Sequence, residues 1–147
     1  MEVIVSLGTY VSDQQVELIT PDGLLQHLPL TDVKALCFLS EMGPADLFTA
    51  HNLFERRPKV PGLWTRFTFR DGDQLDGILS HNLLEWPTSG YLITPPKAGS
   101  NRQRVFIPRP AVVGTELRGV VGRSAVASRQ PRLGKSEGAQ AQLKMFE

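Results

Sequence analysis

Most of the chain consists of short stretches in which apolar and polar residues alternate or β-branched residues cluster, a pattern typical of β-strands. In the first part of the chain these stretches cover residues 2–7, 15–19, 25–30 and 35–39. In the second part they cover residues 64–70, 74–80, 91–94, 104–107 and 116–121. The turn sequences Pro21-Asp22-Gly23 and Asp71-Gly72 separate neighbouring stretches, since Pro presets φ and Gly accepts positive φ. The sequence therefore predicts a mostly antiparallel β protein.

One segment, residues 46–57, has helical spacing. Leu47, Phe48, Leu53 and Phe54 fall on one face, and Pro58 and Pro61-Gly62 end the segment. The pattern predicts a helical connector over residues 41–62. It divides the chain into a β-unit at 1–40, a second β-unit at 63–121 and a tail at 122–147.

The two β-units look related. Leu18-Ile19-Thr20-Pro21 recurs as Leu92-Ile93-Thr94-Pro95, and a strand that ends in proline follows each copy, at Pro29 and Pro108. Each unit is too small to bury much core alone, so we expect two strongly bent units packed against each other. The predicted core residues are Leu18, Leu36, Phe67, Phe69, Ile78, Leu92, Ile93 and Phe106.

The stretch from Phe67 to Leu79 combines alternating apolar residues, Asp71-Gly72, four further residues and Gly77. This order resembles the first motif of Sm-like (Hfq-type) small β-barrels, and residues 105–112 stand where such folds carry their second motif. Residues 2–40 resemble a degenerate copy without the Asp-Gly…Gly signature. The whole arrangement is similar to an uncharacterised bacterial family of tandem modules. The resemblance implies two Sm-like β-barrel units.

Charge and composition narrow the class of protein. The 147 residues carry a net charge of +1, so no global field marks a nucleic-acid binder. The tail is nevertheless basic, with 5 Lys and Arg against 2 Asp and Glu over residues 122–147. The one cysteine, Cys37, lies in an apolar run and indicates a reducing compartment. No signal-peptide pattern or membrane-spanning stretch is present, which favours a soluble, cytoplasmic, bacterial protein.

Catalytic and metal-binding patterns are not found. Asp71, Asp73 and Asp76 do not have the spacing of an EF-hand loop, and a turn with a solvated acidic strand is the expectation for them. His27, His51 and His81 share no ligand spacing with one another or with Cys37. No phosphate-binding glycine loop or nucleophile elbow occurs. We therefore expect a non-enzymatic protein without metal or cofactor.

Arg102, Arg104 and Arg109 surround the second predicted hairpin, with Tyr91 and Phe106 near them in sequence. Such a set is suited to phosphate contacts and base stacking with single-stranded RNA or DNA. The alternative is an edge hairpin protected by charge. The polar and basic elements with which Sm-like proteins contact RNA are replaced here by residues 83–87 and 107–110. Trp86 is expected to contact an oligomer partner or another protein.

The last segment is open to two interpretations. Residues 123–140 are small, polar and basic, too poor in apolar area to fold alone, and they precede Gln142-Leu143-Lys144-Met145-Phe146. One interpretation is a short strand or helical turn that docks on the body. The other is a resemblance to the Gln-Leu-x-Leu/Met-Phe peptide with which bacterial replication and repair proteins bind the DNA sliding clamp.

The clamp resemblance implies a non-enzymatic adaptor that links a β-barrel body to DNA replication or repair. Leu143, Met145 and Phe146 would fill an apolar pocket, and Gln142 would form a hydrogen bond at its rim. The alternative function is an Sm-like module, either nucleic-acid-binding or homo-oligomeric, in which the tail is incidental.

Overall fold

The structure, a computed structural model, describes residues 2–5, 10–39, 48, 52–96, 102–122 and 139–146. These residues form eleven strands and three short 3₁₀ turns, and no α-helix occurs among them, so the prediction of a mostly β protein is confirmed. The strands are β1 (Glu2–Val5), β2 (Val11–Ser12), β3 (Gln15–Ile19), β4 (Leu25–Pro29), β5 (Val33–Leu39), β6 (Gly62–Phe69), β7 (Gln74–Leu79), β8 (Gly90–Ile93), β9 (Arg102–Pro108), β10 (Val112–Val121) and β11 (Ala139–Met145); the turns are η1 (Leu30–Asp32), η2 (Leu83–Glu85) and η3 (Arg109–Ala111).

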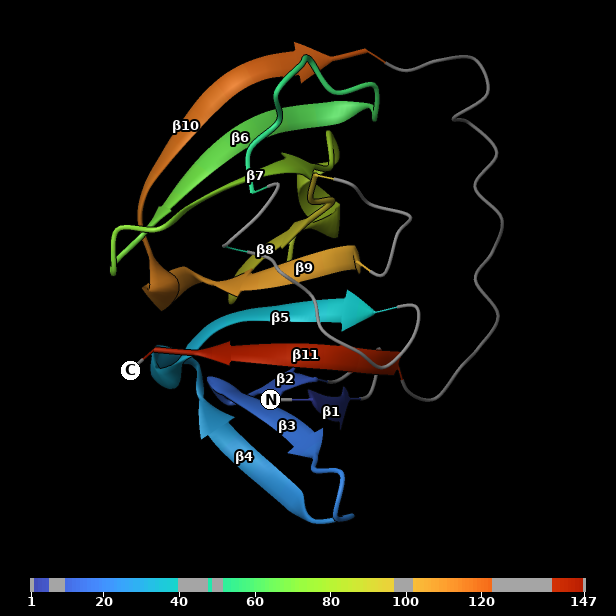
Figure 1. Cartoon of the computed structure of the whole chain (residues 1–147), viewed down its shortest axis with the longest axis vertical. Helices are drawn as coiled ribbons and strands as arrows, with labels where there is room; N and C mark the ends of the chain where they lie inside the picture. The colour runs from blue at the N-terminus through green and yellow to red at the C-terminus, as the bar shows by residue number, and fades with distance from the viewer. Residues whose placement is uncertain are drawn as a thin grey trace.

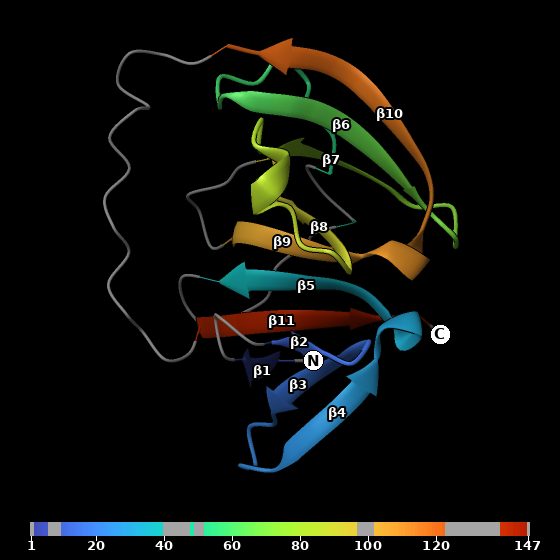
Figure 2. The same ribbon diagram turned by 180° about the vertical axis from the view of Figure 1, so that it is seen from behind.

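The strands pair antiparallel throughout, in an eight-stranded and a three-stranded sheet (Figure 1). The larger sheet has the order β2-β3-β1-β11-β5-β9-β8, with β4 on the other side of β3, and the smaller has the order β10-β6-β7. A bridge between Ile78 and Thr94 joins β7 to β8. The described strands therefore follow one path from β4 to β10, and neither sheet closes into a barrel. Both views place β4 and β10 at opposite ends of the molecule (Figures 1 and 2).

The suggested sequence repeat is visible in the backbone. Pro29 and Pro108 precede η1 and η3 with nearly identical angles, φ −59° and ψ 140° in one and φ −60° and ψ 140° in the other. Val33 and Val112 then open β5 and β10. The order β3, β4, η1, β5 in the first repeat therefore matches β8, β9, η3, β10 in the second.

The C-terminal strand completes the first repeat. β11 pairs with β5 as β6 pairs with β10. Leu36 and Thr115 are each three residues after the valine that opens β5 or β10. Leu143 of β11 lies opposite Leu36, and Phe67 of β6 lies opposite Thr115. Both pairs also shift register at the second residue of β5 and β10. β1 in turn pairs with β11 as β7 pairs with β6. Each repeat thus has one strand order, β4-β3-β1-β11-β5 and β9-β8-β7-β6-β10, although β11 comes last in the chain.

The expectation of a flexible tail over residues 122–147 is corrected for its final part. Residues 139–145 form a central strand between β1 and β5, and residues 123–138 lie outside the described part. Of the two interpretations left open, the strand docked on the body is the one that the structure has. The physical reason is that β1 and β5 both present unpaired backbone edges, and β11 satisfies both at once.

The predicted helical connector is corrected over its described residues. Residues 52–57 run as an irregular segment along β7, where the Asn52 carbonyl accepts from the Asp76 amide at 2.8 Å and the Asn52 side chain donates to the Gln74 carbonyl at 2.8 Å. The Phe54 amide donates to the Asp76 carboxylate at 2.9 Å. These bonds use backbone groups that a helix would pair internally. Residues 46, 47 and 49–51 lie outside the described part.

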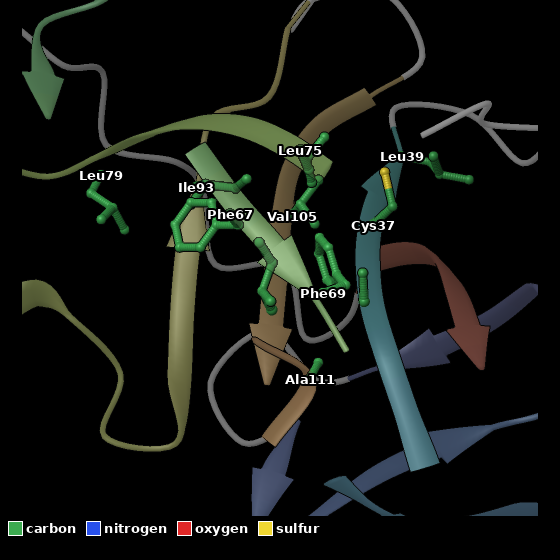
Figure 3. Packing of buried hydrophobic residues seen from close by; sticks show 11 residues of the cluster. Cys37, Leu39, Phe67, Phe69, Leu75, Leu79, Ile93, Val105 and Ala111 are labelled. Carbon is green, nitrogen blue, oxygen red and sulfur yellow. The ribbon is translucent and has the colours of Figure 1, made fainter. Parts of the chain in front are cut away.

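Two apolar clusters form the core, and β5 and β9 lie between them. Cys37 and Val105 face the first cluster, which is shown in Figure 3, while Leu36 and Phe106 face the second. Seven of the eight predicted core residues are buried, and Leu92 is half-buried. At Gly77 an added Cβ would stand 2.3 Å from the Ile93 side chain, so only glycine lets β8 approach β7 here. The two repeats are joined through the β5–β9 pair, which contributes buried residues to both clusters.

Candidate interaction surfaces

The four residues of the clamp-type peptide are all engaged within the molecule. Leu143 is only 1% exposed and packs in the second core cluster, and Gln142 is 9% exposed. The Phe146 amide donates to the Asp32 carbonyl at 3.2 Å, and the Arg70 guanidinium lies 3.6 Å from the centre of the Phe146 ring. Met145, 38% exposed, is the most accessible of the four. The peptide is therefore not available to a partner while β11 stays in the sheet.

The sequence carried a signal for this strand. Ala139, Ala141, Leu143 and Met145 alternate with Gln140, Gln142 and Lys144, which is the period of a half-buried strand. The buried carboxamide oxygen of Gln142 has no hydrogen-bond partner among the described residues.

The structure separates the basic residues predicted to bind nucleic acid. Arg104 lies in β9 opposite Phe38, and Arg109 follows the strand in η3, about 15 Å further along the chain at the rise of a β-strand. Both are exposed, and the Arg109 guanidinium lies 5.8 Å from the centre of the Tyr91 ring. Partial desolvation lowers the pKa of Arg104. The backbone of Arg102 pairs with Leu39, and its side chain is outside the description.

The acidic trio of the second repeat is structural. Asp71 and Asp73 both pair with the Lys34 ammonium, which the Asp71 carboxylate contacts at 2.6 Å. The third carboxylate, Asp76, is fully buried and pairs with Arg66 at 2.7 Å, so the expectation of a solvated acidic strand is wrong for it. No group of three potential metal ligands occurs among the described residues.

Trp86, the expected partner contact, is half-buried. Its indole N–H donates to the Ser80 carbonyl at 2.9 Å, and its ring packs against that of Tyr91. Leu84 in η2 is the large apolar side chain that is most exposed in this region.

Exposed apolar side chains gather at the two free ends of the strand path. At the β4 end, Leu25 is 59% exposed, and at the β10 end Leu117 is 60% exposed. The outer edges of both strands have no pairing partner among the described residues. Long, apolar, unpaired edges are rare in monomeric proteins because they invite pairing with another chain. The full set of exposed large apolar residues at these ends is Ile19, Leu24 and Leu25 on one and Val113, Leu117 and Val120 on the other.

Residues 3–119 match the model of a family of unknown function, DUF6982. The chain belongs to this family. The DUF6982 match runs from within β1 to near the end of β10, so it includes both free edges and leaves β11 outside. No curated protein and no solved structure matches the chain. No helix of the described residues is long and apolar enough to cross a lipid bilayer.

Proposed function

We propose that this protein is a non-enzymatic structural module that assembles with copies of itself through the free edges of its sheets. In this proposal each repeat is a Sm-like unit of five strands. The observation that carries the proposal is that β4 and β10 each have an outer edge without a strand partner among the described residues, and that Leu25 and Leu117 on these strands are exposed to water.

Two properties of these edges support assembly. Strand addition supplies a row of main-chain hydrogen bonds, and alternate side chains then pack against the partner. Removing Leu25 and Leu117 from water would add hydrophobic stabilisation to those bonds.

Sedimentation velocity of the purified chain tests this function. We expect the mean mass to rise as the concentration is raised from about 1 to about 100 µM. Leu117→Lys should hold the protein at the mass of one chain, because a charge at an edge strand opposes pairing. The matched control is Leu84→Lys, an exposed leucine in η2 away from both edges, which should leave assembly unchanged. A single-chain mass at every concentration would refute the function.

A second candidate function is the sliding-clamp adaptor, with Gln142, Leu143, Met145 and Phe146 as its contact residues. The observation in its favour is that β11 lies outside the family match and is joined to β10 by residues 123–138. Clamp binding then requires β11 to leave the sheet, which lowers affinity by the fraction of molecules with β11 released.

Calorimetry with the bacterial clamp separates the steps of this second function. The isolated peptide 138–147 should bind, and the full-length chain should bind more weakly. A peptide with Leu143→Ala and Phe146→Ala is the control, and it should give no heat. Such a peptide is expected to bind with a dissociation constant of roughly 1 to 10 micromolar, so several hundred micromolar clamp should saturate it. If the unaltered peptide gives no heat at that concentration, the adaptor function is excluded.

A further inference from the structure

We infer that copies of this chain join head to tail, with β10 of one copy pairing antiparallel to β4 of the next, as β5 pairs with β9 inside each copy. This inference rests on the proposed self-assembly and specifies which edges meet and in which register.

The internal pair β5–β9 is the template. β5 is the last strand of the first repeat, and β9 is the strand at the far end of the second repeat's order. Their counterparts in the other repeat are β10 and β4, and these two strands end the path of described strands, each with a partner on one side only. Each copy therefore contains one such strand pair, β5–β9, and the two strands, β10 and β4, that could form a second pair with neighbouring copies.

The register of the second junction follows from the first. Phe38 lies opposite Arg104 in the β5–β9 pair. Leu117 is five residues after Val112, as Phe38 is five residues after Val33, so Leu117 takes the place of Phe38. Leu25 is four residues before Pro29, as Arg104 is four residues before Pro108, so Leu25 takes the place of Arg104. Leu117 of one copy should thus lie opposite Leu25 of the next.

The side chains brought together by this register are compatible. The two leucines are more than half exposed in the single chain, and as a cross-strand pair they would cover each other. The adjacent pairs would be Glu116 opposite Gln26 and Thr115 opposite His27, so no like charges meet. Arg118 already pairs with Glu116 at 3.0 Å, and His27 lies 3.7 Å from Glu17.

The far end of β10 is occupied by contacts within the chain. The Val120 carbonyl accepts from Arg57, and the Val121 carbonyl lies 3.0 Å from the His81 ring nitrogen. The predicted contact around Leu117 lies clear of these two residues, so pairing requires no change in the single chain.

A head-to-tail contact joins unlike surfaces and leaves a free edge at each end of any open assembly. Such a contact does not stop at two copies, and it gives a ring where the rotation closes and a filament where it does not. A symmetric contact, such as β10 against β10, would instead stop at a dimer. The two cases predict different behaviour for variants altered at one edge.

Native mass spectrometry of two single-edge variants distinguishes them. Leu25→Lys blocks β4 and Leu117→Lys blocks β10, and both residues are exposed, so both variants should fold. The two altered edges carry like charges, so they do not pair with each other when the variants are mixed. We expect three or more copies in the unaltered protein, one copy in each variant, and a dimer with one chain of each variant when the two are mixed. Circular dichroism confirms that the folds are intact, and Leu84→Lys again serves as the control.

If either single-edge variant still forms dimers alone, the head-to-tail inference is wrong and the proposed self-assembly stands. If the unaltered protein is a single chain at about 100 µM, both fail.

Cross-linking tests the register. The double variant Leu25→Cys, Leu117→Cys should form disulfide-linked multimers under mild oxidation, because directly opposite residues on paired strands have Cβ atoms within bridging distance. The control Gln26→Cys, Leu117→Cys should link at least about tenfold less, since a shift of one residue moves the thiol to the other face of the strand. Equal linking in the two variants would contradict the register.

Discussion

At the scale of single residues, Asp76 in β7 is bonded both to β6 and to the segment of residues 52–57. Its carboxylate is fully buried and accepts hydrogen bonds from Arg66, from the Trp64 indole at 3.2 Å and from the Phe54 amide. The ion pair with Asp76 raises the pKa of Arg66.

We predict that Asp76→Ala lowers the free energy of unfolding by about 3 kcal/mol, because it leaves a partly buried guanidinium and two partly buried N–H donors unpaired. Urea unfolding followed by tryptophan fluorescence measures the change. Asp22→Asn, in an exposed turn, is the control and should change stability by less than about 0.5 kcal/mol. A loss as small as that of the control would show that the carboxylate is not needed.

Lys34 of β5 in the first repeat forms ion pairs with Asp71 and Asp73 in the β6–β7 turn of the second repeat, and the strength of this link depends on pH. Burial alone would lower its pKa, but the hydrogen bonds and ion pairs with Asp71 and Asp73 outweigh burial and raise the pKa of Lys34. For Asp71, burial acts to raise the pKa and the Lys34 contact overcomes it, so the pKa of Asp71 is lowered. The lowered carboxyl pKa adds stability above its unfolded value of about 4, and this stability is lost as the pH falls through the folded pKa.

The unaltered protein should therefore exceed Lys34→Met in stability by about 1 kcal/mol at pH 7, a small value because both aspartates are partly exposed. The difference should shrink below about pH 4. Urea unfolding at pH 7 and pH 3 measures it, with exposed Lys59→Met as control. A difference that persists unchanged at pH 3 would assign it to the contact of the Lys34 ammonium with the face of the Phe48 ring.

Nucleic-acid binding is tested at Arg104 and Arg109. Binding through these two separated cations would be weak and would fall steeply with salt. We expect Arg104→Ala to weaken filter binding of single-stranded RNA or DNA and to reduce the salt slope by about 1. Arg56→Ala, a basic residue outside β9, is the control. An unchanged slope for Arg104→Ala would remove β9 from the binding surface.

At the scale of elements, β11 determines whether the first repeat is complete. Leu143 fills the second core cluster from the middle of the sheet, and Met145 lies near the surface of the same strand. Leu143→Ala should cost about 3 kcal/mol, because the cavity opens beneath two paired strands. Met145→Ala should cost under about 1 kcal/mol. Thermal unfolding of both full-length variants measures these values, and equal effects would contradict the packing role assigned to Leu143.

The sequence predicted the strands whose alternation is strong and local. The stretches predicted at residues 64–70 and 74–80, from apolar periodicity and the Asp71-Gly72 turn between them, are β6 and β7 in the structure. Within the predicted helix over residues 46–57, the described residues 48 and 52–57 are not helical: Phe48 packs on Phe69, and Phe54 packs on Trp64. The place of β11 could not be predicted, since its partners lie more than 100 residues away and pairing depends on closure of the whole fold.

At the scale of the whole molecule, the chain order differs from the spatial order of the repeats. The second repeat runs β6, β7, β8, β9, β10, while the first begins with β11 and continues with β1, β3, β4, β5. The β6–β7 turn with Asp71-Gly72 therefore has its counterpart between the last and the first strands of the chain. This is why residues 2–40 lack the Asp-Gly part of the signature: the strand and turn that would carry it do not precede them. The position of Gly77 is taken by Val3.

A circular permutant tests this equivalence. The strand registers match Met145 to Phe69 and Glu2 to Asp76. Counting two residues on from Met145 and one residue back from Glu2 then matches Glu147 to Asp71 and Met1 to Leu75. Three residues, Gly-Asp-Gln as at 72–74, should then join Glu147 to Met1 as a hairpin. With the chain opened between Gly134 and Lys135, the permutant contains two repeats in the same strand order, and we expect it to fold.

Its free energy of unfolding should stay within about 2 kcal/mol of the parent, because the permutation exchanges the connection through residues 123–138 for a shorter one. Circular dichroism and urea unfolding measure this. As control, the same junction with the chain opened between Cys37 and Phe38, within fully buried β5, should not fold. If the permutant opened at Gly134 is also unfolded, β11 does not occupy in the first repeat the place that β6 occupies in the second. A folded permutant would show that the fold is specified by strand pairing alone, whichever end of the chain supplies the first strand.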